Sequence, residues 1–177
     1  MRLYRARLDY DRCIELFENE IEPIATSPET FETKNWCRAF YAGALYWKAD
    51  YAQAFLQFSE VFQGSSRYRM EAYVGCRWIL RNSSNQGKQN EIIQNALKLS
   101  QTKQDRMAVL VMAVYQSNFL NSISEFDANN LDNYLNVLLK DIIDEQVPVP
   151  ADLPLLIVWY MNRAETVFLP LICPASK

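Results

Sequence analysis

Apolar residues recur along this chain at the spacing that places them on one face of an α-helix. Near the N-terminus the offsets are 0, 3, 4, 7 and 11, at Tyr10, Cys13, Ile14, Phe17 and Ile21. The same offsets return much later, at Leu131, Tyr134, Leu135, Leu138 and Ile142. A helix with a single apolar stripe needs another element to cover that stripe, so the pattern predicts several helices packed together.

Glycine and proline, which interrupt helices, are scarce. The chain has 4 glycines and 7 prolines in 177 residues. An all-β protein needs a turn about every eight to twelve residues, which so few turn-forming residues do not supply. The sequence therefore predicts an all-α fold. Half of its residues are hydrophobic, which suits one domain with a substantial core, and we expect that domain to span residues 1–177.

The positions of the apolar stripes and of the helix-ending residues predict the order of elements. We expect an N-terminal helix at about 8–22, helical hairpins at about 34–63, 69–100 and 105–144, and a C-terminal capping helix at about 152–168. Ser27, followed by Pro28, is a helix start signal, because serine caps free backbone amides and proline suits a first turn. Gly64 is expected to end its helix in a left-handed conformation. The stretch 107–115 is apolar almost all round, which predicts the most buried helix.

Residues 50–62 carry a more specific pattern. Tyr51, Ala54 and Phe58 resemble the second helix of a tetratricopeptide (TPR) hairpin, and related residues stand 41 positions earlier and 38 positions later. The resemblance is to a degenerate TPR-like α-solenoid covering about 34–144, because TPR units measure about 34 residues and related helical repeats about 40 to 47. Only the second half of the motif is kept. The alternative is an ordinary helical bundle in which the same spacing arises from packing alone.

The resemblance implies a protein-binding groove on the concave face of stacked hairpins. The first helices of two successive hairpins would contribute Trp36, Ala39, Gly43 and Tyr46, then Val74, Arg77 and Arg81. Among these, Trp36, Tyr46, Arg77 and Arg81 are the predicted partner-binding residues. The lysine and asparagine set with which TPR domains clamp a C-terminal carboxylate is missing. We therefore expect the ligand to be an acidic and hydrophobic peptide or helix of another protein.

Positive charge and aromatic side chains combine in one segment, at Arg67, Tyr68, Arg69, Tyr73, Arg77, Trp78 and Arg81. This segment fits a groove for an acidic peptide or a weak patch for RNA. A third interpretation buries Trp78 in the core while the arginines extend their charged ends into water. The formal charge of −3 gives no long-range attraction for phosphates, so nucleic acid is not the expected partner.

Most catalytic chemistries lack their residues here. The chain has no histidine, which excludes histidine-dependent triads and zinc motifs, and it has no glycine-rich phosphate loop. The acidic residues are spaced along solvated helix faces. We therefore expect no enzyme activity, no cofactor and no metal.

The cysteines and the apolar runs bear on the compartment. Cys13, Cys37, Cys76 and Cys173 stand alone, which predicts buried thiols in a reducing compartment. No secretory leader is readable, and no apolar run reaches the roughly 20 residues of a membrane span. These features favour the cytoplasm, with the nucleus left open.

Three functions are compatible with this sequence. The first is a scaffold or adaptor that binds another protein. The second is a structural subunit buried in a larger assembly, which the aromatic content of 13% also fits. The third is a small TPR chaperone for secreted proteins, which only the chain length supports.

Overall fold

The computed structural model describes residues 9–65, 67–82, 86–121, 136–137 and 139–140, and within these residues the chain is helical with no strand. The elements are α2 (Tyr10–Leu16), the π-helical turn η1 (Phe17–Ile21), α3 (Pro28–Trp47), α4 (Tyr51–Gly64), α5 (Arg69–Asn82), α6 (Gln86–Leu99) and α7 (Lys103–Asn121). The all-α prediction is confirmed for this part of the chain. Residues 122–135 of the third expected hairpin, and the capping helix expected at about 152–168, lie outside the described residues.

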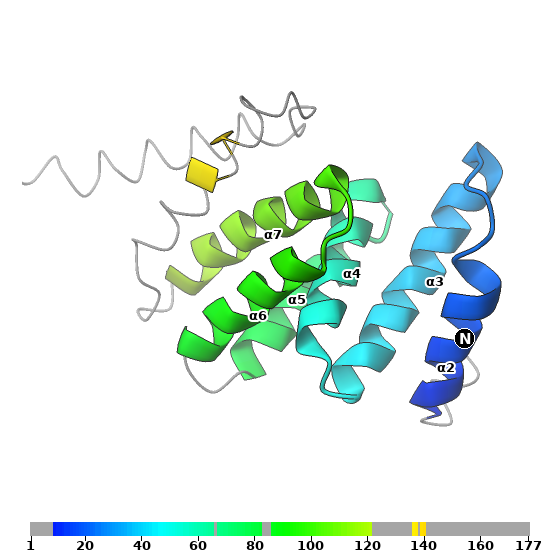
Figure 1. The fold of residues 1–177 in the computed structure, drawn as a ribbon, viewed down its shortest axis with the longest axis horizontal. Coiled ribbons are helices and arrows are strands. Elements are labelled where there is room, and N and C mark those ends of the chain that lie inside the picture. Colours follow the sequence, from blue (N-terminus) through cyan, green and yellow to red (C-terminus); the bar gives the residue numbers. More distant parts are fainter. Residues whose placement is uncertain (1–8, 66, 83–85, 122–135, 138, 141–177) are drawn as a thin grey trace, which may run out of the picture.

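Helix α4 lies at the centre and contacts α3, α5, α6 and α7 (Figure 1). Its buried residues are Ala54, Phe55, Leu56, Gln57, Phe58, Ser59, Val61 and Phe62. The one hydroxyl among them is satisfied within the helix, because Ser59 Oγ donates to the carbonyl oxygen of Phe55 at 2.7 Å. A helix covered on several sides needs small residues where neighbours approach closely, and Ala54, which is fully buried, is such a residue.

Helix α7 is the other deeply buried element. Every residue from Met107 to Val114 is buried, as the apolar run predicted. Gln116, two residues further on, is also buried, and its Nε2 donates to the carbonyl oxygen of Tyr73 at 2.9 Å. This hydrogen bond connects α7 to α5 and lowers the cost of burying the amide.

Helix α3 begins where the start signal predicted. Ser27 accepts from the backbone N–H of Thr30, while Thr30 Oγ1 accepts from the N–H of Ser27, and Pro28 is the first helical residue. This reciprocal cap satisfies amides that a helix start leaves without partners. One continuous helix therefore runs from Pro28, whereas the sequence placed the start of the first hairpin at about residue 34.

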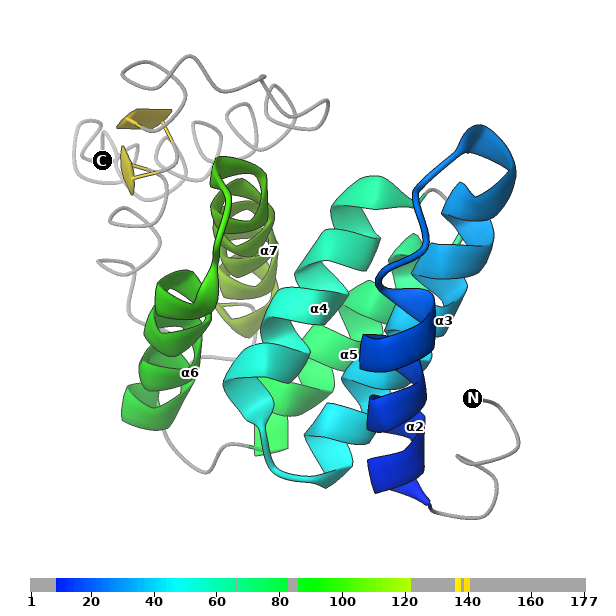
Figure 2. The same ribbon diagram turned by 45° about the vertical axis from the view of Figure 1, so that its right-hand side comes forward.

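The N-terminal helix packs along α3, at the opposite end of the molecule from α6 and α7 (Figures 1 and 2). The buried Phe17 ring stacks on the Tyr41 ring, with centroids 4.4 Å apart. At Phe17 the helix widens to a π-helical turn, in which the carbonyl oxygen of Phe17 accepts from the N–H of Glu22 at 2.8 Å. The wider turn keeps the chain helical up to Ile21.

Gly64 does not adopt the expected left-handed conformation, since no described glycine has a positive φ. It is the last residue of α4, and the chain leaves through extended Ser65. A side chain at Gly64 would instead meet Phe31 and Asn35 at 3.5 Å, in ordinary contact.

The left-handed residue is Ala49, in the tight turn between α3 and α4, with φ of 64°. The N–H of Asp50 donates to the carbonyl oxygen of Leu45, and the N–H of Ala49 donates to that of Tyr46, both at 3.0 Å. This is a Schellman motif, which glycine favours because a Cβ is strained at positive φ. Asp50 then caps α4 by accepting from the N–H of Gln53.

Replacing Ala49 with glycine should raise the free energy of unfolding by about 1 kcal/mol, since glycine adopts positive φ without steric strain. Urea denaturation of both proteins measures this change. Ala39→Gly, inside α3 at ordinary helical geometry, is the control and should lose about 1 kcal/mol. An Ala49→Gly protein that is no more stable than the wild type would contradict the strain at this turn.

Candidate functional site

A mainly apolar groove of about 390 Å³ lies between α3 and α5, with α4 beneath it. Its lining residues are Trp36, Ala39, Phe40, Gly43, Phe58, Tyr68, Met70, Glu71, Val74 and Gly75. We call it the α3–α5 groove. The repeat resemblance placed seven positions on a concave face. Four of them line this groove, namely Trp36, Ala39, Gly43 and Val74.

Two glycines of the groove have opposite surroundings. A Cβ on Gly75 would stand 2.6 to 2.8 Å from ring atoms of Phe58, so glycine is what lets α5 lie this close to α4. A Cβ on Gly43 would meet no atom within 4 Å. Glycine within a helix is less favourable than alanine by about 1 kcal/mol. The packing of the described residues accounts for Gly75 but leaves the space at Gly43 empty.

Exposed apolar residues follow the α5 side of the groove. Met70, Val74 and Trp78 are 71%, 38% and 59% exposed, and they recur at every fourth residue, which places them on one helix face. The opposite face carries the buried Ala72, Cys76, Ile79 and Leu80. Trp78 is therefore not a core residue, and the interpretation that buried it is wrong. Large exposed apolar side chains in a row mark a surface that another molecule can cover.

Four arginines lie on or beside this helix. The guanidinium of Arg69 lies over the ring of Phe62, 4.4 Å from its centroid, and that of Arg67 lies over Tyr68 at 5.4 Å. Arg77 and Arg81 are one turn apart, on the same helical face as Met70 and Val74. Burial raises the pKa of Tyr73, and the charge of Arg77 opposes that rise. The exposed apolar row is thus bordered by positive charge towards the C-terminal end of α5.

The four predicted binding residues are distributed along this face and do not form one cluster. Trp36 lines the groove and packs edge-on against Phe40, with centroids 4.9 Å apart. Tyr46 lies outside the lining, where its hydroxyl accepts from Asn82 Nδ2 and so connects α3 to α5. Arg77 and Arg81 also lie outside the lining, on α5.

Sequence reasoning missed Met70 and Phe40 as groove residues. The signal for Met70 was present, because Met70, Val74 and Trp78 form a second apolar row on a helix whose buried row is separate. Nothing local distinguishes Phe40 from a core residue, since it shares a stripe with buried Cys37 and Ala44.

The chemistry of the described residues is limited. Burial raises the pKa of the Cys37 and Cys76 thiols, which keeps them protonated and poorly nucleophilic. No three described histidine, cysteine, aspartate or glutamate residues are grouped so as to hold a metal. Within the described ranges, no helix combines the length and the apolar character needed to cross a bilayer.

Comparisons with known proteins identify no relative of this chain. The chain matches no protein-family model, no curated protein and no solved structure at a significant level.

The two glycines should respond in opposite directions to alanine. Gly43→Ala should stabilise the protein by about 0.5–1 kcal/mol, because helix propensity improves and the methyl group meets nothing. Gly75→Ala should destabilise it by about 1 kcal/mol or more, because the methyl group collides with the Phe58 ring. Urea denaturation measures both changes. Equal changes in the free energy of unfolding for the two substitutions would mean that α3, α4 and α5 are not packed around the groove as described.

Proposed function

We propose that the protein is a non-enzymatic binding scaffold, built of TPR-like stacked hairpins, whose α3–α5 groove takes an amphipathic helix of a partner protein. The empty space at Gly43 is the observation that carries this proposal. A mid-helix glycine lowers stability, and no described residue uses the room that it leaves. A partner helix laid over Gly43 can approach α3 closely, at the short end of the usual 8–10 Å between helix axes.

The lining favours apolar side chains in the partner. Trp36, Phe40 and Val74 present apolar surface around the open position, and the exposed Met70 extends it. A helix that binds such a groove supplies apolar residues at i, i+4 and i+7, which follow one face. A stacked arrangement of this part of the chain is supported by the groove itself, because α3 and α5 both line it and both pack on α4.

Charge indicates what flanks those apolar residues in the partner. Arg77 and Arg81 lie at the border of the exposed row, and the lining contains a single acidic residue, Glu71. Opposite charges across an interface raise the association rate and favour one orientation. The partner helix is therefore acidic on the side that faces the C-terminal half of α5.

Two variants test the groove by independent routes. Gly43→Leu should fill the open position and abolish binding while the fold remains, because the added side chain meets no atom of the described chain close to its Cβ. The double variant Arg77→Glu, Arg81→Glu should weaken binding at least about tenfold through charge repulsion. Affinity purification from the native cell with quantitative mass spectrometry, followed by titration of the purified partner, measures both.

Gln94→Leu, at an exposed position of α6 outside the groove, is the matched control, since it adds a leucine away from Gly43 and should retain the partner. Circular dichroism and thermal unfolding should show that all variants are folded. Equal recovery of every bound protein by wild type and by Gly43→Leu would exclude the groove as the binding site.

A second function, a structural subunit of a larger assembly, is favoured by apolar exposure away from the groove. Ile24, Trp47 and Leu99 are 48%, 62% and 45% exposed. A subunit enclosed by neighbours would bury such side chains in its interfaces. Size-exclusion chromatography with light scattering distinguishes the two functions, because an enclosed subunit self-associates when alone and a scaffold remains monomeric.

A further inference from the structure

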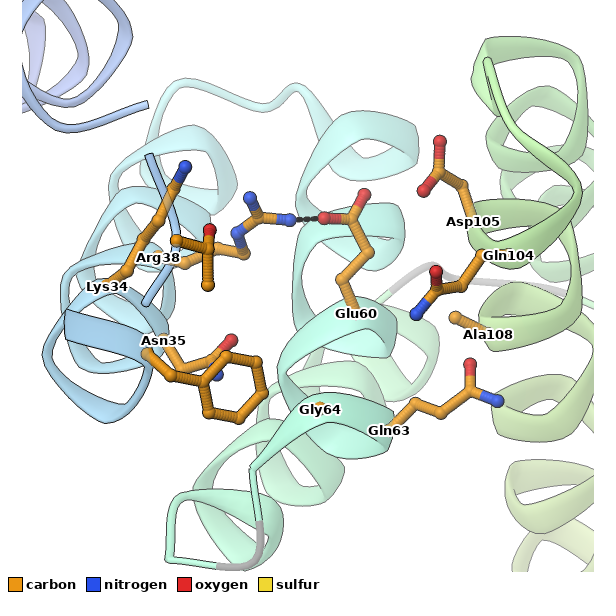
Figure 3. Close-up of a pocket in the computed structure, with 11 residues that line it drawn as sticks. Lys34, Asn35, Arg38, Glu60, Gln63, Gly64, Gln104, Asp105 and Ala108 are labelled. Carbon is orange, nitrogen blue, oxygen red and sulfur yellow. Dashed lines mark ion pairs between the residues drawn. The ribbon is translucent and has the colours of Figure 1, made fainter. Parts of the chain in front are cut away.

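A second, polar groove lies on the other side of α3. Two cavities of about 370 and 480 Å³ lie between α3, α4 and the chain around the start of α7, and they adjoin at Arg38, Glu60 and Asp105, which line both. We call the two together the polar groove. Figure 3 shows part of it, with Asn35 and Arg38 on α3, Glu60 and Gln63 on α4, and Gln104 on α7.

The two grooves use different faces of α3. The polar groove is lined by Lys34, Arg38 and Tyr41, which are spaced at offsets of 0, 4 and 7. The α3–α5 groove is lined by Trp36, Phe40 and Gly43, which have the same spacing but begin two residues later. Two residues correspond to about 200° around a helix, so the rows lie on opposite sides. A ligand of the polar groove is therefore independent of the proposed partner helix.

The charged groups of the polar groove are engaged with one another. The guanidinium of Arg38 donates to both carboxylate oxygens of Glu22, at 2.9 and 3.0 Å, and is paired with Glu60. Lys34 Nζ donates to the carbonyl oxygens of Glu22 and Ile24.

The phenol of Tyr41 is held as a hydrogen-bond donor. Its hydroxyl donates to Glu18 at 2.8 Å. Burial is the main cause that raises the pKa of Tyr41 well above its ordinary value, and the hydrogen bond to Glu18 raises it further. The groove therefore has a charged wall whose groups are already paired with one another.

The balance of charge in the polar groove is acidic. Its lining includes Glu18, Glu22, Glu60 and Asp105, against only two basic side chains, Lys34 and Arg38. An anionic ligand is disfavoured there, and a ligand with a positive side chain is favoured.

Side-chain amides are the most unusual feature of this groove. Its lining contains six of them, at Asn35, Gln53, Gln57, Gln63, Gln101 and Gln104. The three on α4 spread over about 120° of the helix circumference, and the ten residues from Gln53 to Gln63 correspond to about 15 Å along the helix axis. Gln63 and Gln104 are exposed. Each amide offers both a donor and an acceptor.

One of these amides is buried without a partner. Asn35 is 8% exposed, and its Nδ2 donates to no described residue. Arg38 Nε, on the same wall, is also a buried donor without an acceptor. Buried donors of this kind lower stability, so an oxygen acceptor brought to this wall gains more here than at a solvated surface.

We propose that the polar groove binds an extended peptide segment of a partner protein, through its backbone, with a lysine or arginine among its side chains. An extended segment presents one N–H and one C=O at each residue, which is the donor and acceptor pair that a side-chain amide matches. A helix uses these groups internally and offers none along its length. The 15 Å between Gln53 and Gln63 accommodates about five extended residues at roughly 3.3 Å each.

Random heptapeptides displayed on phage are the probe. They are selected on the full-length protein, and the affinities of enriched peptides are measured by fluorescence anisotropy. We expect enrichment of Lys and Arg, and a dissociation constant that rises at least tenfold for the double variant Gln63→Ala, Gln104→Ala. Methylating backbone nitrogens of a selected peptide should weaken binding by a similar factor. Gln94→Ala, an exposed glutamine of α6 outside both grooves, is the matched control and should bind as the wild type does.

The same selection can overturn the proposal. Failure to enrich any peptide, or peptides whose affinity is unchanged by the double variant, would exclude the polar groove as a peptide site. Peptides that bind the glutamine double variant but not the Gly43→Leu variant would occupy the α3–α5 groove. That result would refute this proposal and leave the proposed function standing. Circular dichroism confirms that each variant is folded before its binding is interpreted.

Discussion

The burial of α4 against four other helices is the constraint from which the rest of the arrangement follows. Because its buried residues face several directions, each neighbour is positioned by a different contact on it. Gly75 brings α5 against the ring of Phe58, and the thiol of Cys76 donates to the carbonyl oxygen of Phe55 at 3.7 Å. The tight turn at Ala49 holds α3 antiparallel to α4 through two backbone hydrogen bonds. Once α3 and α5 are both placed on α4, the distance between them is determined as well.

The two grooves are consequences of that placement. Helix α3 uses Cys37, Ala42, Ala44 and Leu45 for the core, and the two groove-lining rows fall on either side of these buried residues. On the side towards α5 they are aromatic or small, and the result is an apolar groove. On the side towards the start of α7 they are Lys34, Arg38 and Tyr41, and the result is a polar groove. One helix therefore separates two surfaces of opposite chemistry.

The N-terminal helix contributes to only one of these surfaces. Glu18 and Glu22, in and directly after the π-helical turn, reach Tyr41 and Arg38 on α3. Such pairs contribute little when solvated, and Glu22 is 48% exposed, so its pair with Arg38 adds little stability. The same contacts that attach η1 to α3 also form the acidic wall of the polar groove.

By itself, the sequence determined what depends on neighbours along the chain. The all-α character of the described residues, the Ser27 cap and the burial of Met107 to Val114 were all readable, because caps and apolar runs act within a turn or two of helix. Only the tertiary structure decided which of several apolar faces is covered. It left Trp78 exposed and Gly43 open, joined Tyr46 to Asn82, and moved the left-handed residue from Gly64 to Ala49. Helical periodicity assigns residues to a common face, but the burial of that face depends on helices that are distant in sequence and adjacent in space.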